Sequence, residues 1–407
     1  MIVRGGMVVT AAGVKRLDVA IRDGRITRVD RDLEEQAEEI DARGLHIFPG
    51  GIDSHVHFNE PGRTEWEDIA HGTAALAAGG YTAFIDMPLN NLPVTTTVEA
   101  FDLKIAAMKR SAGVDYGLWG GLVPGNLDQL APLAQRGVMG FKAFMCPSGI
   151  DEFPMCDERT LREGMKRIAE LDSILLVHAE NPALLREPKG TTARDFLDSR
   201  PPEAEVGAIT TLIAMARESG CRLHVVHVST ARGAALIDGV SVTGETCPHY
   251  LLYTEQDLDR LGGIGKCAPP FRKERMHMMP MVVSDHSPSA LDLKQGDDFR
   301  KIWGGISGCQ STRQLLLAHG ELDLPQVAAV TSTNIARRFG LTNKGDIAPG
   351  FDADLWIVDL DHQDVVRRED LLYRNQFSVH EGQKIRGKTI KTLTRGKPQL
   401  IRPGGRS

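Results

Sequence analysis

The middle of the chain repeats one unit eight times: an apolar run of strand length, a polar residue at its end, and a stretch of helical character. The runs cover residues 50–57, 81–87, 115–122, 138–145, 174–179, 223–228, 241–246 and 281–284. Runs rich in Val, Ile and Leu without polar alternation are typical of a parallel sheet that is covered on both faces. Eight of them alternating with helices predict an α/β fold, a (β/α)8 TIM-type barrel over residues 49–342.

The two ends of the chain have a different pattern. They contain short alternating segments broken by Gly and Asp, such as DVAIRDGRITRVD near the start and GKTIKTLTRGKPQLI near the end. Such segments predict β-hairpins. We therefore expect a small β-sandwich domain built from both termini, residues 1–48 and 343–407, with the barrel inserted between them.

Two of the crossovers are short for this scheme. Only STARGAALIDGV lies between Val228 and Ser241, and the stretch from Arg272 to Met281 is similarly tight. A crossover between parallel strands usually needs about a dozen residues or more, mostly in its helix. We expect either that residues are missing from this chain near positions 190, 240 and 275, or that the crossover helices are truncated.

Polar residues at the ends of the apolar runs form a candidate metal site, because barrels gather their chemistry at the carboxyl ends of the strands. His55 and His57 are two residues apart and therefore face the same way. His178, His227 and Asp285 end three further runs. One histidine at a strand end is more often a structural residue, but this combination of imidazoles with a carboxylate favours a site for zinc-like ions.

Lys142, in the run VMGFKAFM, is the unusual member of this set. A protonated lysine has three N–H donors and no acceptor, so it cannot bind a cation. If burial and nearby metal ions lowered its pKa, the neutral amine could add carbon dioxide and give a carbamate with two acceptor oxygens. From the local sequence alone, a lysine that extends to solvent or pairs with a carboxylate is the commoner alternative.

Composition and charge argue against several classes of protein. The net charge of -6 offers no basic patch for nucleic acid or anionic lipid. We expect no membrane span and no signal peptide, since no apolar run approaches roughly 18 residues and the opening residues lack the signal pattern. The six cysteines form no CxxC pair, which is typical of reduced thiols. These features predict a cytoplasmic protein.

Several motifs together closely resemble the cyclic amidohydrolases of the amidohydrolase superfamily, and their allantoinase branch above all. They are PGGIDSHVHFNEPGRTEWEDI, GFKAFM, VHAEN, HVST, GETCPHYL, KCAPP, SDHSP, GGISGCQS and IAPGFDADL. The resemblance covers nearly the whole chain. It implies a (β/α)8 barrel with two divalent metal ions, usually zinc, and a homodimer or homotetramer that acts on a small molecule.

The resemblance also implies roles for the six candidate ligands. One ion would be held by His55, His57 and Asp285, the other by His178 and His227, and a carboxylated Lys142 would bridge them. It implies hydrolysis of a cyclic amide by a hydroxide between the two ions, with Asp285 carrying the proton to the departing ring nitrogen. Relatives that have lost their metals act as scaffolds instead, but this chain keeps all six residues.

Two positions bear on the substrate. Dihydroorotases have an arginine where this chain has Asn59, and hydantoinases and dihydropyrimidinases usually have a tyrosine where it has Pro147. A neutral amide suits an uncharged ring better than an anionic one, so we expect hydrolysis of allantoin to allantoate. Activity on a hydantoin, a dihydropyrimidine or dihydroorotate is the alternative.

Further residues are candidates for the substrate pocket. The Gly-rich segment WGGISGCQS resembles the family's substrate loop, which makes Ser307 and Gly308 candidate contacts, together with Asn59 and Asn90. Glycine-rich turns and loop asparagines are also common without any binding role. His249 and His286 stand at strand ends and are candidates near the metals or the substrate. We expect structural or surface positions for three others, His71, His224 and His277.

Overall fold

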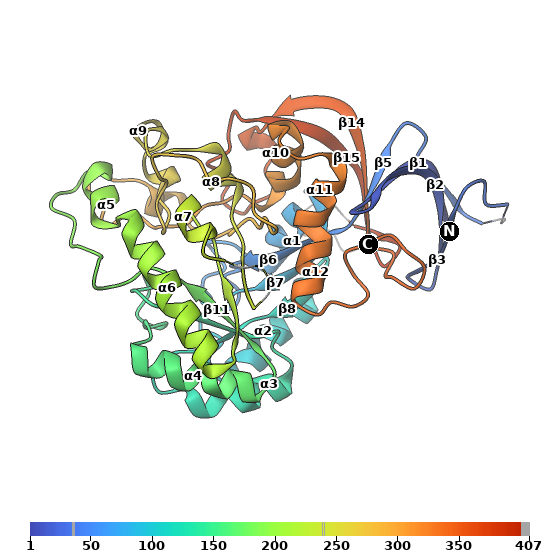
Figure 1. Ribbon diagram of the computed structural model, residues 1–407. Helices are drawn as coiled ribbons and strands as arrows, with labels where there is room; N and C mark the ends of the chain where they lie inside the picture. Colours follow the sequence, from blue (N-terminus) through green and yellow to red (C-terminus); the bar gives the residue numbers. More distant parts are fainter. Residues whose placement is uncertain (35–36, 238, 240, 400–407) are drawn as a thin grey trace.

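The computed structural model describes residues 1–34, 37–237, 239 and 241–399 and confirms the barrel (Figure 1). Seven of the eight apolar runs contain strands that pair in parallel with their neighbours. These strands are β6 (Gly51–Val56), β7 (Tyr81–Asp86), β8 (Asp115–Leu118) with β9 (Gly120–Gly121), β10 (Phe141–Phe144), β11 (Ile174–His178), β12 (Arg222–Val225) and β13 (Val242–Gly244). Parallel pairing brings all their carboxyl ends to one side of the barrel.

The hydrogen-bonded ladder of the barrel is interrupted in two places, at the third and at the eighth run. The third run is divided at Trp119, so that β8 pairs with β7 and β9 pairs with β10. The eighth run, residues 281–284, forms no strand in the described part of the chain. Single parallel bridges join Thr246 to Val282 on one side and Val56 to His286 on the other. The predicted eighth strand is therefore reduced to bridges, although its place in the ring is the expected one.

Helices cover the outside of the first part of the barrel. They are α1 (Ile69–Ala78), α2 (Val98–Ser111), α3 (Leu130–Arg136), α4 (Glu158–Glu170), α5 (Ala193–Ser199) and α6 (Pro202–Ser219). Helix α4 shows why these segments are helical. Asp157 accepts a hydrogen bond from the first-turn N–H of Thr160, and the buried Leu161, Met165 and Ile168 recur at helical spacing on the side that faces the barrel.

Shorter helices serve the second part of the barrel and the segment after it. They are α7 (Ala231–Ala234), α8 (Pro248–Leu252), α9 (Asp257–Leu261), α10 (Thr312–His319), α11 (Leu324–Ala328) and α12 (Asn334–Arg338). In the described residues, the crossover before β13 contains one turn of helix, α7, and the stretch from Arg272 to Met281 contains none. Both connections match the expectation of truncated helices, while residues 238 and 240 lie outside the described residues.

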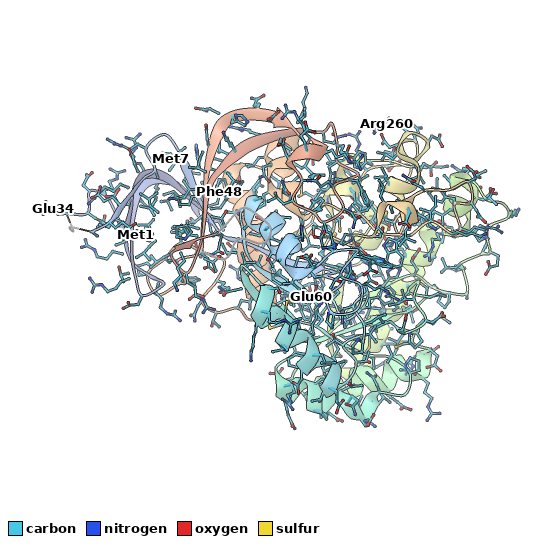
Figure 2. The ribbon with its side chains drawn as sticks, turned by 180° about the vertical axis from the view of Figure 1, so that it is seen from behind. Met1, Met7, Glu34, Phe48, Glu60 and Arg260 are labelled. Carbon is cyan, nitrogen blue, oxygen red and sulfur yellow. The ribbon has the colours of Figure 1, made fainter. Side chains whose placement is uncertain are left out.

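The two chain ends form one mixed sheet beside the barrel (Figure 1). Its strands are β1 (Ile2–Thr10), β2 (Gly13–Arg22), β3 (Arg25–Asp30), β4 (Glu39–Asp41), β5 (His46–Pro49), β14 (Leu355–Val365), β15 (Lys384–Thr394) and β16 (Lys397–Pro398). Strand β5 pairs in parallel with β1 and antiparallel with β14. Seen from behind, Met1 and Met7 lie at one end of the molecule, far from Arg260 (Figure 2). The termini therefore share a sheet as expected. The packing of two sheets into a sandwich stays a prediction, and residues 400–407 lie outside the described residues.

Two cationic side chains, the half-buried Lys344 and the buried Arg313, connect this sheet to the barrel. Lys344 Nζ lies 2.6 Å from a carboxylate oxygen of Asp115 in β8 and 2.6 Å from one of Asp354, which precedes β14. The guanidinium carbon of Arg313, in α10, lies 4.2 Å from the ring centroid of Trp356 in β14. An ion pair and a cation–ring contact therefore connect the terminal sheet to the barrel.

All six cysteines are unpaired and buried. Among the described residues, no helix is long and apolar enough to cross a bilayer.

Candidate metal centre

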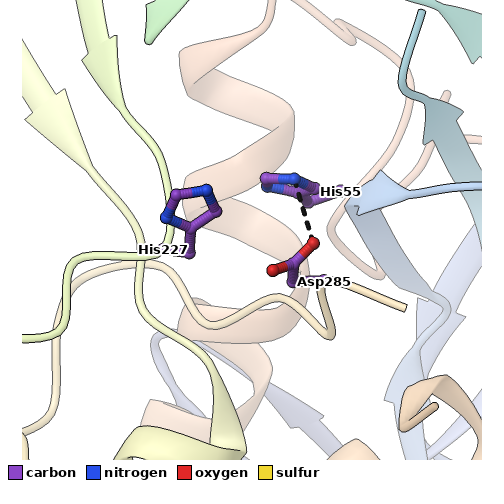
Figure 3. A group of neighbouring side chains, drawn as sticks. All are labelled: His55, His227 and Asp285. Atoms are coloured by element: carbon purple, nitrogen blue, oxygen red, sulfur yellow. Dashed lines mark ion pairs between the residues drawn. The ribbon is translucent and has the colours of Figure 1, made fainter. Parts of the chain in front are cut away.

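The first group of predicted ligands meets at the carboxyl ends of the strands. Oδ1 of Asp285 lies 3.2 Å from Nε2 of His55 and 3.5 Å from Nε2 of His57. Donor atoms of His55, His227 and Asp285 all lie within 4.8 Å of one another, and Figure 3 shows these three side chains facing one another. His55 is in β6 and His57 follows its last residue, so the local strand geometry presents both imidazoles to one point.

His178 and His227 form a second group next to the first. Nδ1 of His178 lies 3.1 Å from Nε2 of His227, and the rings of His227 and His55 are 5.4 Å apart between centroids. Burial, followed by the charge of neighbouring groups, lowers the pKa of both His55 and His227 well below the usual value. The two ring nitrogens lie within hydrogen-bond distance, and neutral imidazoles grouped in this way suit a shared cation.

Lys142 in β10 lines the same cavity as these residues. Burial lowers the pKa of its amine to about 8, although the charges of Asp285 and Glu245 act in the opposite direction. Its Nζ lies 4.9 Å from the centroid of the Phe144 ring, and no carboxylate forms an ion pair with it in the part of the chain that the structure describes. Lys142 is therefore a buried amine whose pKa is lowered toward neutrality, as a carbamate would require.

The donor set fits a divalent metal centre. It combines four imidazoles, one carboxylate and an amine of lowered pKa on the lining of one cavity. Nδ1 of His227 is also buried without a hydrogen-bond partner among the described residues, which is unusual for a buried polar atom.

Three residues that line the cavity have left-handed backbone conformations. They are Asn90, with φ of 79°, His227, with φ of 38°, and Asp285, with φ of 47°. A residue other than glycine in this region costs about 1–3 kcal/mol and persists only where its surroundings hold it, most often at functional sites. The strained backbone falls where β12 and the eighth run end, so it also helps to explain why the ladder stops there.

Two buried carboxylates orient the candidate ligands. Oε1 of Glu245 lies 2.6 Å from Nδ1 of His55, and Oε2 of Glu180 lies 2.7 Å from Nε2 of His178. Arg200 pairs with Glu180 in turn. A carboxylate on the far nitrogen of an imidazole fixes its tautomer and raises its basicity toward a metal.

Sequence reasoning missed these three residues. The available signal was that Glu180 lies two residues after His178 in VHAEN and that Glu245 is the last residue but one of the apolar run 241–246.

The cavity in front of these groups measures about 730 Å³. Asn90 and Pro147 line it, as does the segment from Trp303 to Gly305. The other three predicted substrate contacts lie away from this lining: they are Asn59, Ser307 and Gly308. Asn59 is fully buried and donates from Nδ2 to the backbone oxygen of Pro288 at 3.4 Å. The Gly-rich segment thus reaches the cavity through its first residues, before Ser307.

The five other histidines considered in the sequence lie in different environments. Nδ1 of His286 accepts a hydrogen bond from the backbone N–H of Gly308 at 3.2 Å. His224 is buried with Nε2 3.1 Å from Glu245, whereas His71 is half-buried against Asp68. His277 is exposed. His249 is buried beside Asp285.

Lys104 of α2 is a buried support for the segment that carries His57. Its Nζ lies 2.8 Å from Oδ2 of Asp86 and donates to the backbone oxygens of Phe58 and Glu60. We expect Lys104→Met to lower the free energy of unfolding by about 3–5 kcal/mol, because the Asp86 carboxylate would remain buried without its partner. Urea unfolding measures this. The exposed Lys109 of the same helix provides the control Lys109→Met, and equal losses in both variants would contradict the assignment.

Glu67 makes the stability of the folded protein depend on pH. Burial raises its pKa to about 8, and the facing groups are the Arg374 N–H, which donates to Oε1 at 3.1 Å, and His286, whose Nε2 is 3.6 Å from Oε2. Because its pKa in the folded protein lies above the unfolded value of 4.5, the folded state holds an extra proton between these values. Stability is therefore lost as pH rises through this window.

We expect Glu67→Gln to remove much of this decline. Its Tm should equal that of the wild type near about pH 5 and exceed it at about pH 8, because the amide needs no proton to remain neutral. Thermal unfolding over this range tests the expectation, with Glu65→Gln in the same loop as an exposed control. A parallel decline in wild type and Glu67→Gln would show that another group is responsible.

Comparisons with known proteins agree with this geometry. The model of the Amidohydrolase family matches residues 46–397. A protein named allantoinase from Solibacter usitatus is 50% identical, with 97% of this chain and 92% of the relative covered. Another, from Rubrobacter xylanophilus, is 50% identical over 100% of this chain and 95% of the relative. That alignment spans 433 positions, more than the 407 residues here, so the relative has residues without counterparts in this chain.

Solved structures with lower sequence identity have the same fold. An L-hydantoinase (dihydropyrimidinase) from Arthrobacter aurescens has a TM-score of 0.94 and 29% sequence identity, and it covers 99% of this chain and 96% of its own. A dihydropyrimidinase from Brevibacillus agri has a TM-score of 0.89 at 29% identity, with 99% of this chain and 95% of that chain covered.

Proposed function

This chain belongs to the amidohydrolase family, and from that premise we propose that it hydrolyses the cyclic amide bond of allantoin to give allantoate. The observation that carries the proposal is the meeting of six candidate ligands from five strand ends at one cavity. The two allantoinases at 50% identity over nearly their whole length supply the substrate.

Family membership implies a divalent metal centre, and we propose zinc as its metal. His55, His57 and Asp285 would hold one ion, and His178 and His227 the other. Lys142, carboxylated at Nζ, would lie between them. When bound, such a pair of ions lowers the pKa of water and polarises the carbonyl that is attacked.

Asp285 is the proposed catalytic residue. Its carboxylate lies between His55 and His57 and reaches the cavity, with 13% of its side chain exposed. It would accept the proton of the attacking water and deliver it to the ring nitrogen that departs, which balances the charge of the step. Glu245 and Glu180 would keep His55 and His178 in one orientation throughout.

One amide side chain lines the cavity and could contact the ring. Asn90 offers an amide beside Ser287, to which its Nδ2 donates at 3.3 Å. Asn59 does not line the cavity. We propose that it affects the substrate indirectly, through its hydrogen bond to the backbone of Pro288. Ser307 and Gly308 likewise stay proposals, since the backbone N–H of Gly308 points to His286.

Turnover measured on four rings tests the proposal. We expect kcat/KM for allantoin to exceed that for dihydroorotate, dihydrouracil and hydantoin by at least about tenfold, since hydrogen-bonding differences of this kind are worth 1–3 kcal/mol. A preference of the same size for dihydroorotate would contradict the interpretation of Asn59.

Hydantoinase activity is the second candidate. It is favoured by the fold match to the Arthrobacter aurescens L-hydantoinase, at a TM-score of 0.94. A higher kcat/KM on hydantoin or dihydrouracil than on allantoin would establish it.

We also propose that residues 1–48 and 343–407 act as one small domain around the barrel of residues 49–342, and that the protein is a cytoplasmic homodimer or homotetramer. Light scattering of the purified protein measures the number of copies.

A further inference from the structure

One wall of the cavity has no regular secondary structure. It is formed by residues 299–305, called the wall segment from here on, of which residues 300–305 line the cavity. All seven residues are described, and they belong to no helix or strand. Their backbone carbonyls therefore lack the partners that a helix or a sheet supplies, and a buried carbonyl without a partner is unfavourable. Other groups must hold this segment in place.

Lys266 holds the first half of the wall segment. Its Nζ donates to the backbone oxygens of Phe299, Arg300 and Ile302, at 2.6, 3.2 and 2.6 Å. A lysine ammonium has three N–H donors, so this side chain uses all of them on the wall segment. The same Nζ lies 5.0 Å from the ring centroid of Phe196 and 5.4 Å from that of Phe299, within the range of a cation–ring contact. One side chain thus supplies the hydrogen bonds that a helix or a sheet would otherwise give.

Lys294, the last residue of the 3-10 helix η3 (Leu291–Lys294), holds the second half. Its Nζ donates to the backbone oxygens of Trp303 and Gly305, both at 2.8 Å, and to that of Lys266 at 3.2 Å. The side chains of Lys266 and Lys294 are buried, and neither forms an ion pair with a carboxylate in the part of the chain that the structure describes. Backbone oxygens therefore compensate both buried charges.

The wall segment also fits closely against the residues that follow Asp285. A Cβ atom at Gly305 would lie 2.8 Å from Oγ of Ser287 and closer still to the backbone oxygen of Ser287. Oγ of Ser287 accepts a hydrogen bond from Nδ2 of Asn90, which lines the cavity as well. A displaced wall segment would lose this fit and change the shape of the cavity on the substrate side.

We propose that Lys266 and Lys294 are positioning residues for substrate binding: together they hold the wall segment against the cavity, and replacing either lysine lets the segment open. The reaction at the candidate metal centre should be unaffected, because no hydrogen bond joins the wall segment to the six candidate ligands among the described residues. A wall that is closed for a smaller fraction of the time weakens apparent substrate binding in proportion. The effect on the substrate rests on the proposed function, whereas the holding of the wall segment does not.

Limited proteolysis with trypsin tests the holding of the wall segment without reference to activity. Trypsin cleaves after lysine and arginine, and the segment contains the exposed Arg300 and Lys301. Cleavage requires a locally opened backbone, so its rate reports how often the segment opens. We expect Lys266→Met and Lys294→Met to be cleaved after these two residues at least about tenfold faster than the wild type. The exposed Lys273 provides the control Lys273→Met, which should be cleaved there at the wild-type rate.

Steady-state kinetics with allantoin tests the effect on the substrate. We expect Lys266→Met and Lys294→Met each to raise KM at least about tenfold while kcat stays within about threefold of the wild type, the pattern of lost binding with intact chemistry. Burial lowers the pKa of Lys266 to about 8 and that of Lys294 to about 7. Both assays are therefore run at about pH 6.5, where each side chain is mainly protonated.

Wild-type cleavage rates in both lysine variants would overturn the inference. Faster cleavage with an unchanged KM would overturn the effect on the substrate, and so would a kcat that falls as much as kcat/KM, because the chemistry itself would then be affected. A wild type that does not hydrolyse allantoin would contradict the proposed function, while the cleavage rates would still decide whether the lysines hold the wall segment. Circular dichroism shows whether each variant is folded, and each lysine variant provides the test if the other does not fold.

Discussion

Replacing Asp285 by Asn is expected to lower kcat/KM for allantoin by about 10⁴-fold, the upper end of what a general acid–base group contributes. The amide keeps the shape of the side chain and tolerates the left-handed backbone at this position, but it cannot accept a proton. The His178 and His227 group does not depend on this carboxylate, so an ion there should remain bound. Asp285→Ala should lose as much activity, with an added cost from the strained backbone.

Steady-state kinetics together with metal analysis checks this expectation. The exposed Asp361 provides the control Asp361→Asn, which should behave as the wild type. Activity of Asp285→Asn within about tenfold of the wild type would show that another group moves the proton. Loss of all metal together with activity would show instead that Asp285 is mainly a ligand.

Replacing Lys142 by Met is expected to remove the bridge between the two ions and to lower kcat/KM by a similar factor, about 10⁴, since a two-ion site then loses its common ligand. Methionine fills the buried space of the lysine stem, so the fold should survive. We expect the metal content to fall below two ions per chain. In the wild type, native mass spectrometry in bicarbonate should show an added mass of one carbon dioxide that is absent from the variant.

A matched substitution at the exposed Lys166, Lys166→Met, controls for loss of a lysine elsewhere. Because the pKa of Lys142 is about 8, the neutral amine grows as pH rises through this value. Reactivation of metal-free enzyme by bicarbonate and zinc should therefore be faster at about pH 9 than at about pH 7. Full metal content and full activity in Lys142→Met would refute the carbamate.

The barrel could be predicted from the sequence because its signal is repeated and local. Each apolar run carries its own evidence for a buried parallel strand, and the ends of the runs mark one side of the ring. His55, His57 and Lys142 could be placed for this reason. The run 281–284 shows the limit, since it is joined to its neighbours only by single bridges on either side of the left-handed Asp285, and no local pattern predicts that conformation.

Residues that act on the ligands from a distance could not be placed in this way. Glu180 and His178 both lie at the end of β11, two residues apart. The ion pair between Glu180 and Arg200 depends instead on how the segment before α6 packs. The cavity wall at Trp303 to Gly305 depends on where a long loop folds back, which is why Ser307 and Gly308 fall behind it. Such contacts are set by tertiary packing and leave no periodic trace in the chain.

The sheet shared by the two termini has a consequence for co-translational folding. Strand β5 emerges among the first fifty residues, yet its partner β14 is completed only at Val365. Throughout the intervening elongation, the leading segment exposes an unsatisfied strand edge, the kind of surface that attracts other nascent chains. A chain whose synthesis stops before β14 would be prone to aggregation. Binding of chaperones to arrested chains should cease once β14 has left the exit tunnel.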